Sequence, residues 1–299
     1  MSEMSMRKIV LAAGLCALVI PGLALAQKKP AKVAPTVAAG PAHPGAPAAT
    51  DWRSPDPENT LIIDSTKGRI VVELYPEIAP NHVTRVKELV RSGLYDGRTF
   101  FRVIDYFMAQ TGDPQETGEG GSDKPDIAAE FTFRRSSTTP FQLVADQTVS
   151  EVGFLGAMPI MTQSSMLMPM TADNKISGWG LFCPGVAGMA RADNPDSANS
   201  QFFLMRQAYP SLEKRYTAFG RAIFGIEAIR TIKVGEPVAE PRDRMDKVRI
   251  LADIPAAERP RVRVIDPASP WFKAEVAAVR GEMGADFTAC AIRIPSEVK

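Results

Sequence analysis

The sequence predicts a mainly β fold: a closed antiparallel barrel of eight strands, capped by two helices. Many short runs rich in β-branched and aromatic residues follow one another at hairpin spacing, without regular strand–helix alternation. Only two segments of the central region carry apolar residues at helical spacing. This pattern is typical of a barrel whose ends are covered by helices.

The first predicted elements are a hairpin and a helix. Two β-rich runs, TLIID and RIVVELY, flank the turn STKG and begin the ordered part of the chain near residue 59. The helix is expected within 76–93, where valine and leucine recur at helical spacing. Pro80 suits its first turn and Gly93 its end. A strand, a turn and a second strand are predicted over 94–113.

Later elements are predicted with one interruption. Residues 137–183 are rich in Met, Ser and Gly without a clean period, which predicts an inserted loop region. The tail, 255–299, is a C-terminal extension with a helix expected near 271–280 and a strand near 287–294. Strand patterns lie at 128–131, 185–190, 200–205, 217–224 and 247–254, and a short helix at 225–235.

The N-terminus predicts export. Arg7 and Lys8 precede an apolar run that ends in Ala24-Leu25-Ala26, so residues 1–26 resemble a signal peptide cleaved after Ala26. An uncleaved anchor is the alternative, because this run is just long enough to span a bilayer. Cleavage leaves no membrane span. Residues 27–58 are rich in Pro and Ala and predict a disordered linker, so the main domain is expected at 59–254.

The composition excludes several classes of function. With 35 Lys and Arg against 34 Asp and Glu, no basic surface is expected and nucleic acid is not an expected partner. The only histidines, His43 and His82, are too few for a histidine-rich metal cage, so we expect neither metal nor cofactor. After cleavage two cysteines remain, Cys183 and Cys290, either as separate buried thiols or as a disulfide.

One cation lies inside an apolar strand. Arg102 is surrounded by aromatic and aliphatic residues in TFFRVIDYFMAQTGD, and arginine keeps its charge in proteins. A three-residue connection after Ile104 would place Arg102 opposite Gln110, whose carbonyl can accept from a guanidinium; a two-residue connection would place it opposite Ala109. We favour Gln110. An arginine that only reaches solvent from a strand end is the structural alternative.

Several motifs together resemble the cyclophilin family of peptidyl-prolyl isomerases. They are GRIVVELYPEIAPNHV, SGLYDGRTFFRVI, FFRVIDYFMAQTGD, GVAGMARADNPDSANSQFF and VRILADI, in the family's order over roughly 59–254. The resemblance implies that Arg102 and Gln110 are catalytic. It implies that substrate is bound by Phe107, Met108, Ala190, Gln201, Phe203, Leu212 and Tyr216.

The chain also departs from the family pattern. Ser211 stands where the family often has Trp, although Tyr209 is near, and Phe101 replaces a usual polar residue before the arginine. Arg191 stands where Asn is frequent. Strand alternation predicts that Phe202 faces the core while Gln201 and Phe203 face a cleft.

The implied activity fits a site without histidine. The X-Pro bond has a barrier of about 18–20 kcal/mol, which comes from amide resonance, and the transition state is a twisted amide with a pyramidal nitrogen. A fixed cation can donate to the lone pair that emerges there.

The implied function is isomerisation of exposed X-Pro bonds in unfolded or partly folded proteins, by a monomer in a bacterial periplasm. The alternative is a non-catalytic holdase with the same fold. For the methionine-rich insertion, a packed loop, an adaptable apolar surface that extends the client groove, and a soft-metal site remain open.

Overall fold

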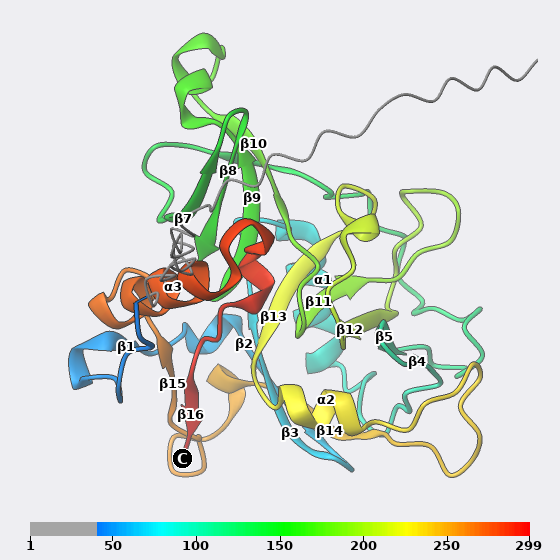
Figure 1. The fold of residues 1–299 in the computed structure, drawn as a ribbon. Helices are drawn as coiled ribbons and strands as arrows, with labels where there is room; N and C mark the ends of the chain where they lie inside the picture. Colours follow the sequence, from blue (N-terminus) through cyan, green and yellow to red (C-terminus); the bar gives the residue numbers. More distant parts are fainter. Residues whose placement is uncertain (1–40) are drawn as a thin grey trace, which may run out of the picture. The chain divides into compact units, whose positions relative to one another are not determined.

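The computed structural model describes residues 41–299, and its main sheet has eight antiparallel strands (Figure 1). The predicted signal peptide and the first part of the predicted linker lie outside these residues. The strand order is β14 (Met245–Ile250), β2 (Thr60–Ser65), β3 (Gly68–Leu74), β13 (Ala218–Phe224), β11 (Val186–Met189), β12 (Phe202–Met205), β5 (Met108–Thr111) and β4 (Arg102–Ile104).

The main sheet is an open half-barrel, so the predicted closure is wrong. β4 and β14 are the two edges and no ladder joins them. β4 has only three residues, and the chain that follows α2 (Ile226–Thr231) lies beside it. The isolated bridges Thr99↔Arg244 and Val103↔Gly235, with further backbone hydrogen bonds, link this edge to the segment before β14 without forming a ladder.

Two helices accompany this sheet, as predicted. α1 (Pro80–Arg91) packs against β14 and β13 and buries the predicted apolar face. Pro80 occupies the first turn, and Gly93, with φ of +76°, follows the end of the helix. α2 packs on β3 and is shorter than the pattern at 225–235 predicted.

The insertion is a second sheet, so the prediction of a loop over 137–183 is wrong. Its strand order is β6 (Phe133–Arg135), β10 (Ile176–Gly180), β9 (Met158–Gln163), β8 (Ser150–Leu155) and β7 (Gln142–Gln147). All six residues of β8 are buried, and a strand buried on both faces loses the alternation that marks strands in a sequence.

Both ends of the described chain form a third sheet. Its order is β1 (Trp52–Arg53), β15 (Val262–Ile265) and β16 (Ser296–Val298). The prediction of disorder is therefore wrong from about residue 49 onwards. Paired hydrogen bonds of 2.6 and 2.7 Å from Arg53 to Glu73 of β3 hold this segment, a long-range contact that composition does not reveal.

The C-terminal extension begins as predicted and ends differently. α3 (Pro270–Met283) covers the expected helix, and Phe272 packs edge-on against Phe154 of β8 at 5.3 Å. The strand expected at 287–294 is wrong, because these residues form short helical turns and the strand follows at β16. A disulfide joins Cys183 to Cys290 and decides the alternative that the sequence left open.

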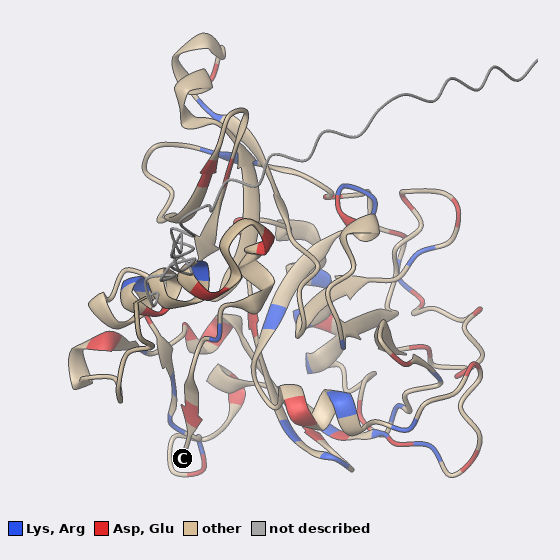
Figure 2. Ribbon diagram, in the orientation of Figure 1, with Lys and Arg blue, Asp and Glu red and all other residues tan. Residues whose placement is uncertain are grey.

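Charged residues of both signs are scattered over the described ribbon (Figure 2). Within residues 41–299 no helix is both long and apolar enough to cross a membrane. In the same range no cluster of three or more His, Cys, Asp or Glu side chains is suited to a metal ion.

Candidate active site

Arg102 and Gln110 face each other across β4 and β5. They are register partners, which confirms the three-residue connection expected from the sequence. The Nη1 of Arg102 donates to Oε1 of Gln110 at 3.1 Å, and about 37% of the arginine side chain is exposed. The cation therefore lies at a rim, where it is held by the sheet and still reaches solvent.

A relay of amides fixes the orientation of Gln110. Gln201 donates from Nε2 to the carbonyl oxygens of Gly118 and Gly120, at 3.0 and 2.8 Å. Because those carbonyls can only accept, Oε1 of Gln201 is turned towards Gln110 and accepts from its Nε2 at 2.8 Å. Gln110 is then left with its own oxygen facing Arg102.

A cavity of about 780 Å³ opens beside Arg102. Gln201 is absent from its lining and lies in an adjoining hollow of about 610 Å³, which Gln110 and Ala190 share. The other residues predicted to be catalytic or to bind substrate all line the cavity: Arg102, Phe107, Met108, Gln110, Ala190, Phe203, Leu212 and Tyr216.

The wall of the cavity is apolar and well packed. Phe203 pairs with Gln110 across β12 and β5 and is 4% exposed. Its neighbour Phe202 packs against Tyr95 and Phe219 in the core, so the predicted alternation is confirmed. Leu212 lies in a single helical turn that starts after Tyr209.

The residues that depart from the family pattern lie in or beside the wall of the cavity. Tyr209 packs against Phe107 with ring centroids 4.4 Å apart and planes tilted by 45°, but neither it nor Ser211 lines the cavity. Phe101 is buried and contributes to the lining. The Arg191 guanidinium lies over the ring of Tyr216 at 4.6 Å, so it covers that part of the wall.

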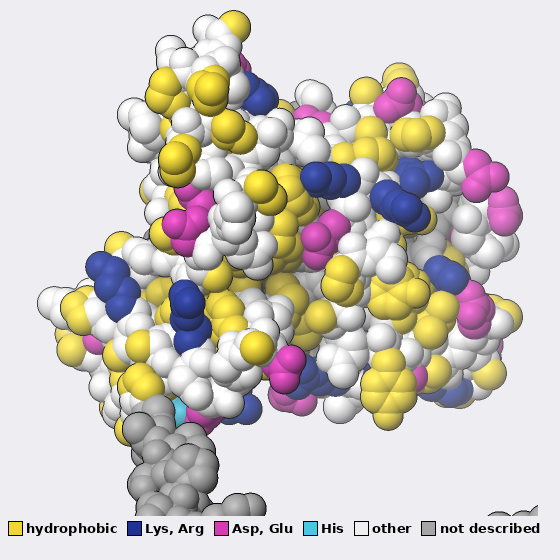
Figure 3. Space-filling model, turned by 45° about the horizontal axis from the view of Figure 1, so that its top comes forward, with side chains coloured by type: hydrophobic (Ala, Val, Ile, Leu, Met, Phe, Trp, Pro, Cys, Tyr) yellow, Lys and Arg dark blue, Asp and Glu magenta, His cyan; other side chains and the backbone are white. Residues whose placement is uncertain are grey.

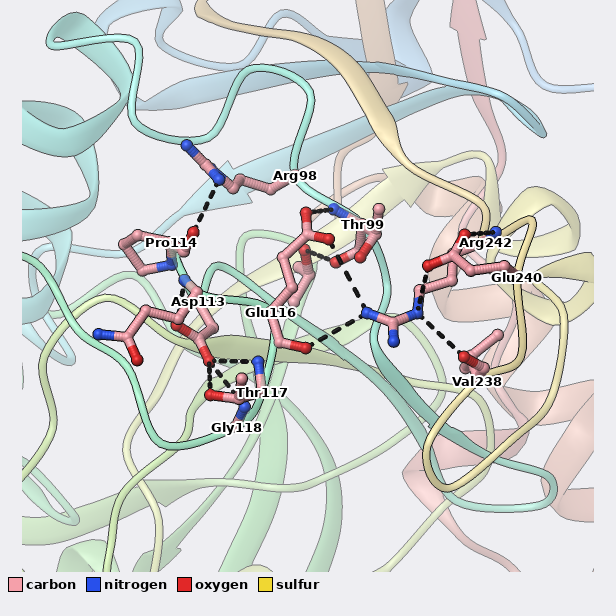
Figure 4. Close-up of polar contacts among 12 residues, drawn as sticks. Arg98, Thr99, Asp113, Pro114, Glu116, Thr117, Gly118, Val238, Glu240 and Arg242 are labelled. Atoms are coloured by element: carbon pink, nitrogen blue, oxygen red, sulfur yellow. Dashed lines mark hydrogen bonds and ion pairs between the residues drawn. The ribbon is translucent and has the colours of Figure 1, made fainter.

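Two loops that the sequence did not assign to the site form the other side of the cavity. One carries Glu116, Thr117 and Gly118, and the other carries Glu236 and Arg242. Figure 4 shows Glu116 and Arg242 in contact between the two loops. Glu236 accepts from Nε of Arg102 at 2.6 Å. The only available signal was the charged, proline-containing run GEPVAEPRD between a predicted helix and strand.

Asp113 organises the first of these loops. It is fully buried, which raises the pKa of its carboxyl, but backbone N–H groups of Gln115, Gly118, Gly120 and Thr117 donate to it and lower the pKa below its ordinary value. The bonds from Gly118 and Thr117 measure 2.7 and 2.9 Å. The glycine carbonyls that orient Gln201 are thereby held in place.

Comparisons with known proteins identify the family of the chain. The family model for cyclophilin-type peptidyl-prolyl cis-trans isomerases matches residues 60–252. A probable peptidyl-prolyl cis-trans isomerase of Brucella suis is 36% identical over 214 residues, which cover 66% of this chain and 85% of that protein. The human peptidyl-prolyl cis-trans isomerase-like 1 is 28% identical, with 69% of this chain and 95% of that protein covered.

A solved structure extends the likeness beyond the family domain. The cyclophilin AquaCyp293 from Hirschia baltica is 36% identical, with a TM-score of 0.76 over 83% of this chain and 93% of that one. The chain therefore belongs to the cyclophilin-type peptidyl-prolyl cis-trans isomerases, which act on proline-containing peptides.

Proposed function

We propose that Arg102 catalyses X-Pro isomerisation by stabilising the twisted amide. The observation that carries this proposal is a guanidinium held by Gln110 at the edge of a cavity with one apolar wall. In the ground state the prolyl nitrogen lone pair is delocalised and accepts poorly. In the transition state the nitrogen is pyramidal, so a donor fixed beside it favours that state selectively.

The apolar wall of the cavity supplies the part of the rate acceleration that Arg102 does not. A ten-thousandfold acceleration needs about 5–6 kcal/mol, whereas one hydrogen bond from a charged donor contributes about 1.5–3 kcal/mol. Arg102 is therefore insufficient alone. The proline ring would be held against Phe107, Met108, Phe203 and Leu212, with Ala190 and Tyr216 at the edge, while Gln110 and Gln201 hold the flanking backbone.

Replacement of Arg102 tests the mechanism. In an isomerisation assay on a short Xaa-Pro peptide, Arg102→Ala is expected to lower kcat/KM about tenfold to a hundredfold, since one charge-assisted hydrogen bond is lost. Arg102→Lys keeps the charge but loses the planar fork and should recover only part of the activity. Equal turnover by wild type and Arg102→Ala would refute the mechanism.

We also propose that the chain acts on exported proteins in a bacterial periplasm. The signal-like segment at 1–26 favours export. The Cys183–Cys290 disulfide supports an oxidising compartment, where such bonds form and persist. Folding proteins with exposed X-Pro bonds are the natural substrates there.

A second function, the binding of unfolded proteins as a holdase, is favoured by the surface of the insertion. Eight large apolar residues are exposed in the described chain, and five of them lie within 137–183: Leu143, Val149, Met166, Leu167 and Met170. Figure 3 shows separate apolar side chains on this part of the molecule, as on the rest of the face in view. Unbranched methionines adapt to varied apolar partners, so this surface suits unfolded chains in addition to catalysis.

A further inference from the structure

The loop after α2 runs beside β4 and forms backbone hydrogen bonds with the residues on both sides of Arg102. Val103 and Gly235 exchange two backbone hydrogen bonds, of 2.8 and 2.9 Å. The N–H of Val238 donates to the carbonyl of Phe101 at 2.9 Å. The loop therefore occupies the edge of the sheet at the point where Arg102 lies.

This register sets Glu236 opposite Arg102. One residue along from the Val103↔Gly235 bridge, Glu236 faces Arg102 from the loop, as Gln110 faces it from β5. Glu236 accepts from Nε at 2.6 Å and Gln110 from Nη1 at 3.1 Å. Two edges of the guanidinium are thus fixed from opposite sides, and no described residue accepts from Nη2.

The loop that carries Glu236 is itself held in place. Pro237 and Pro241 restrict its backbone, and the side chain of Val238 is 2% exposed. Arg242 donates from Nε to the carbonyl of Val238 at 2.9 Å and from Nη1 to the carbonyl of Glu116 at 3.2 Å (Figure 4). Arg242 therefore links this loop to the loop that Asp113 organises.

We propose that Glu236 is a positioning residue that fixes the Arg102 guanidinium for catalysis. A free arginine side chain has many rotamers, and freezing them before substrate arrives removes that entropy from the reaction barrier. The carboxylate engages Nε and leaves the Nη2 hydrogens for the prolyl nitrogen. The inference rests on the proposed role of Arg102, and it predicts an effect on kcat more than on KM.

Matched variants in the peptide isomerisation assay test this role. Glu236→Ala is expected to lower kcat about threefold to fivefold, as for loss of a partly exposed ion pair, with KM changed less than about twofold. Glu236→Gln should recover most of the loss, because its amide oxygen can still accept from Nε. Glu227→Ala, which removes the same charge from α2 without touching Arg102 or Arg242, should stay within about twofold of wild type.

An NMR signal of Arg102 separates positioning from a general effect on stability. The Nε–Hε cross-peak of Arg102, identified by its loss in Arg102→Lys, should be sharp in wild type and in Glu236→Gln, and broadened in Glu236→Ala. Unchanged kcat and cross-peak in Glu236→Ala would overturn the inference. A higher kcat in Glu236→Ala would also overturn it, because Glu236 would then hold the Arg102 guanidinium away from its catalytic position. If Arg102→Ala is itself fully active, the proposed function fails instead.

Discussion

At the scale of single residues, Asp113 fixes the backbone of a loop that lines the cavity, although Asp113 itself does not line it. Its Oδ1 accepts from the N–H of Gln115 at 2.8 Å, while three more N–H groups converge on Oδ2. A carboxylate offers acceptors on both oxygens, whereas an asparagine would turn an NH₂ group towards some of these donors. The negative charge is therefore part of the local structure.

We expect Asp113→Asn to lower the free energy of unfolding by about 2 kcal/mol at pH 7, because charge-assisted hydrogen bonds are lost. The pKa of Asp113 is lowered in the fold. Its contribution is thus present above the unfolded pKa of about 3.9 and is lost as the pH falls through the folded pKa. Urea unfolding of both proteins at several pH values should show a gap that narrows below about pH 4; a constant gap would contradict this account.

Residue-level predictions succeeded where the physics is local. The pairing of Arg102 with Gln110 follows from a short turn, and the opposite directions of Phe202 and Phe203 follow from strand alternation. Glu236 could not be found in this way. It lies 134 residues from Arg102, and its position depends on how a loop is added to the edge of a sheet.

At the scale of elements, the insertion shows why buried strands escape sequence patterns. β8 and β9 form a hairpin around Gly156, which has φ of +53° and is followed by Ala157. β8 packs on one side against α3, a helix more than a hundred residues later in the chain. Because α3 covers a face of β8 that would otherwise be exposed, the strand lacks the alternation of apolar and polar residues that marks a half-exposed strand. The local sequence does not reveal that α3 packs there.

The exposed end of the insertion leads to a prediction about clients. Met166 and Met170 are 83% and 82% exposed. The double change Met166→Ser and Met170→Ser should leave isomerisation of a short peptide within about twofold of wild type. It should weaken suppression of aggregation of a denatured, proline-containing protein, because apolar contact with the client is lost.

Tyr106→Ser is the matched control, because Tyr106 is 74% exposed and lies outside the insertion. Light scattering of the client during dilution from denaturant measures the effect. Unchanged suppression by the methionine variant, or an equal loss in the tyrosine variant, would remove the client-binding role from the insertion.

At the scale of the whole described chain, both ends pack beside the inserted sheet. β1 pairs with β15 near the C-terminus, α3 lies against β8, and Arg280 of α3 donates to the carbonyl of Val144 on β7. The disulfide adds a covalent link between the segment before β11 and the tail, across 107 residues of chain. The extension is therefore integrated into the fold.

That link gives a prediction about stability and export together. Closing a loop of about a hundred residues restricts the unfolded chain, so reduction, or Cys183→Ser with Cys290→Ser, should lower the free energy of unfolding by about 2–5 kcal/mol. Peptide isomerisation should persist, because neither cysteine lines the cavity beside Arg102.

The full chain, produced in a bacterium that secretes it, should have an intact mass that starts at Gln27 and lacks two hydrogens. The same chain from Gln27, made in a reducing cytoplasm, should keep both thiols and show the lower stability until it is oxidised. A secreted protein that still contains residues 1–26 would contradict signal cleavage. Equal unfolding midpoints for the reduced and oxidised forms would contradict the stabilising role of the disulfide. Reduction increases the conformational entropy of the unfolded chain much more than that of the native state, so the reduced form should unfold more readily.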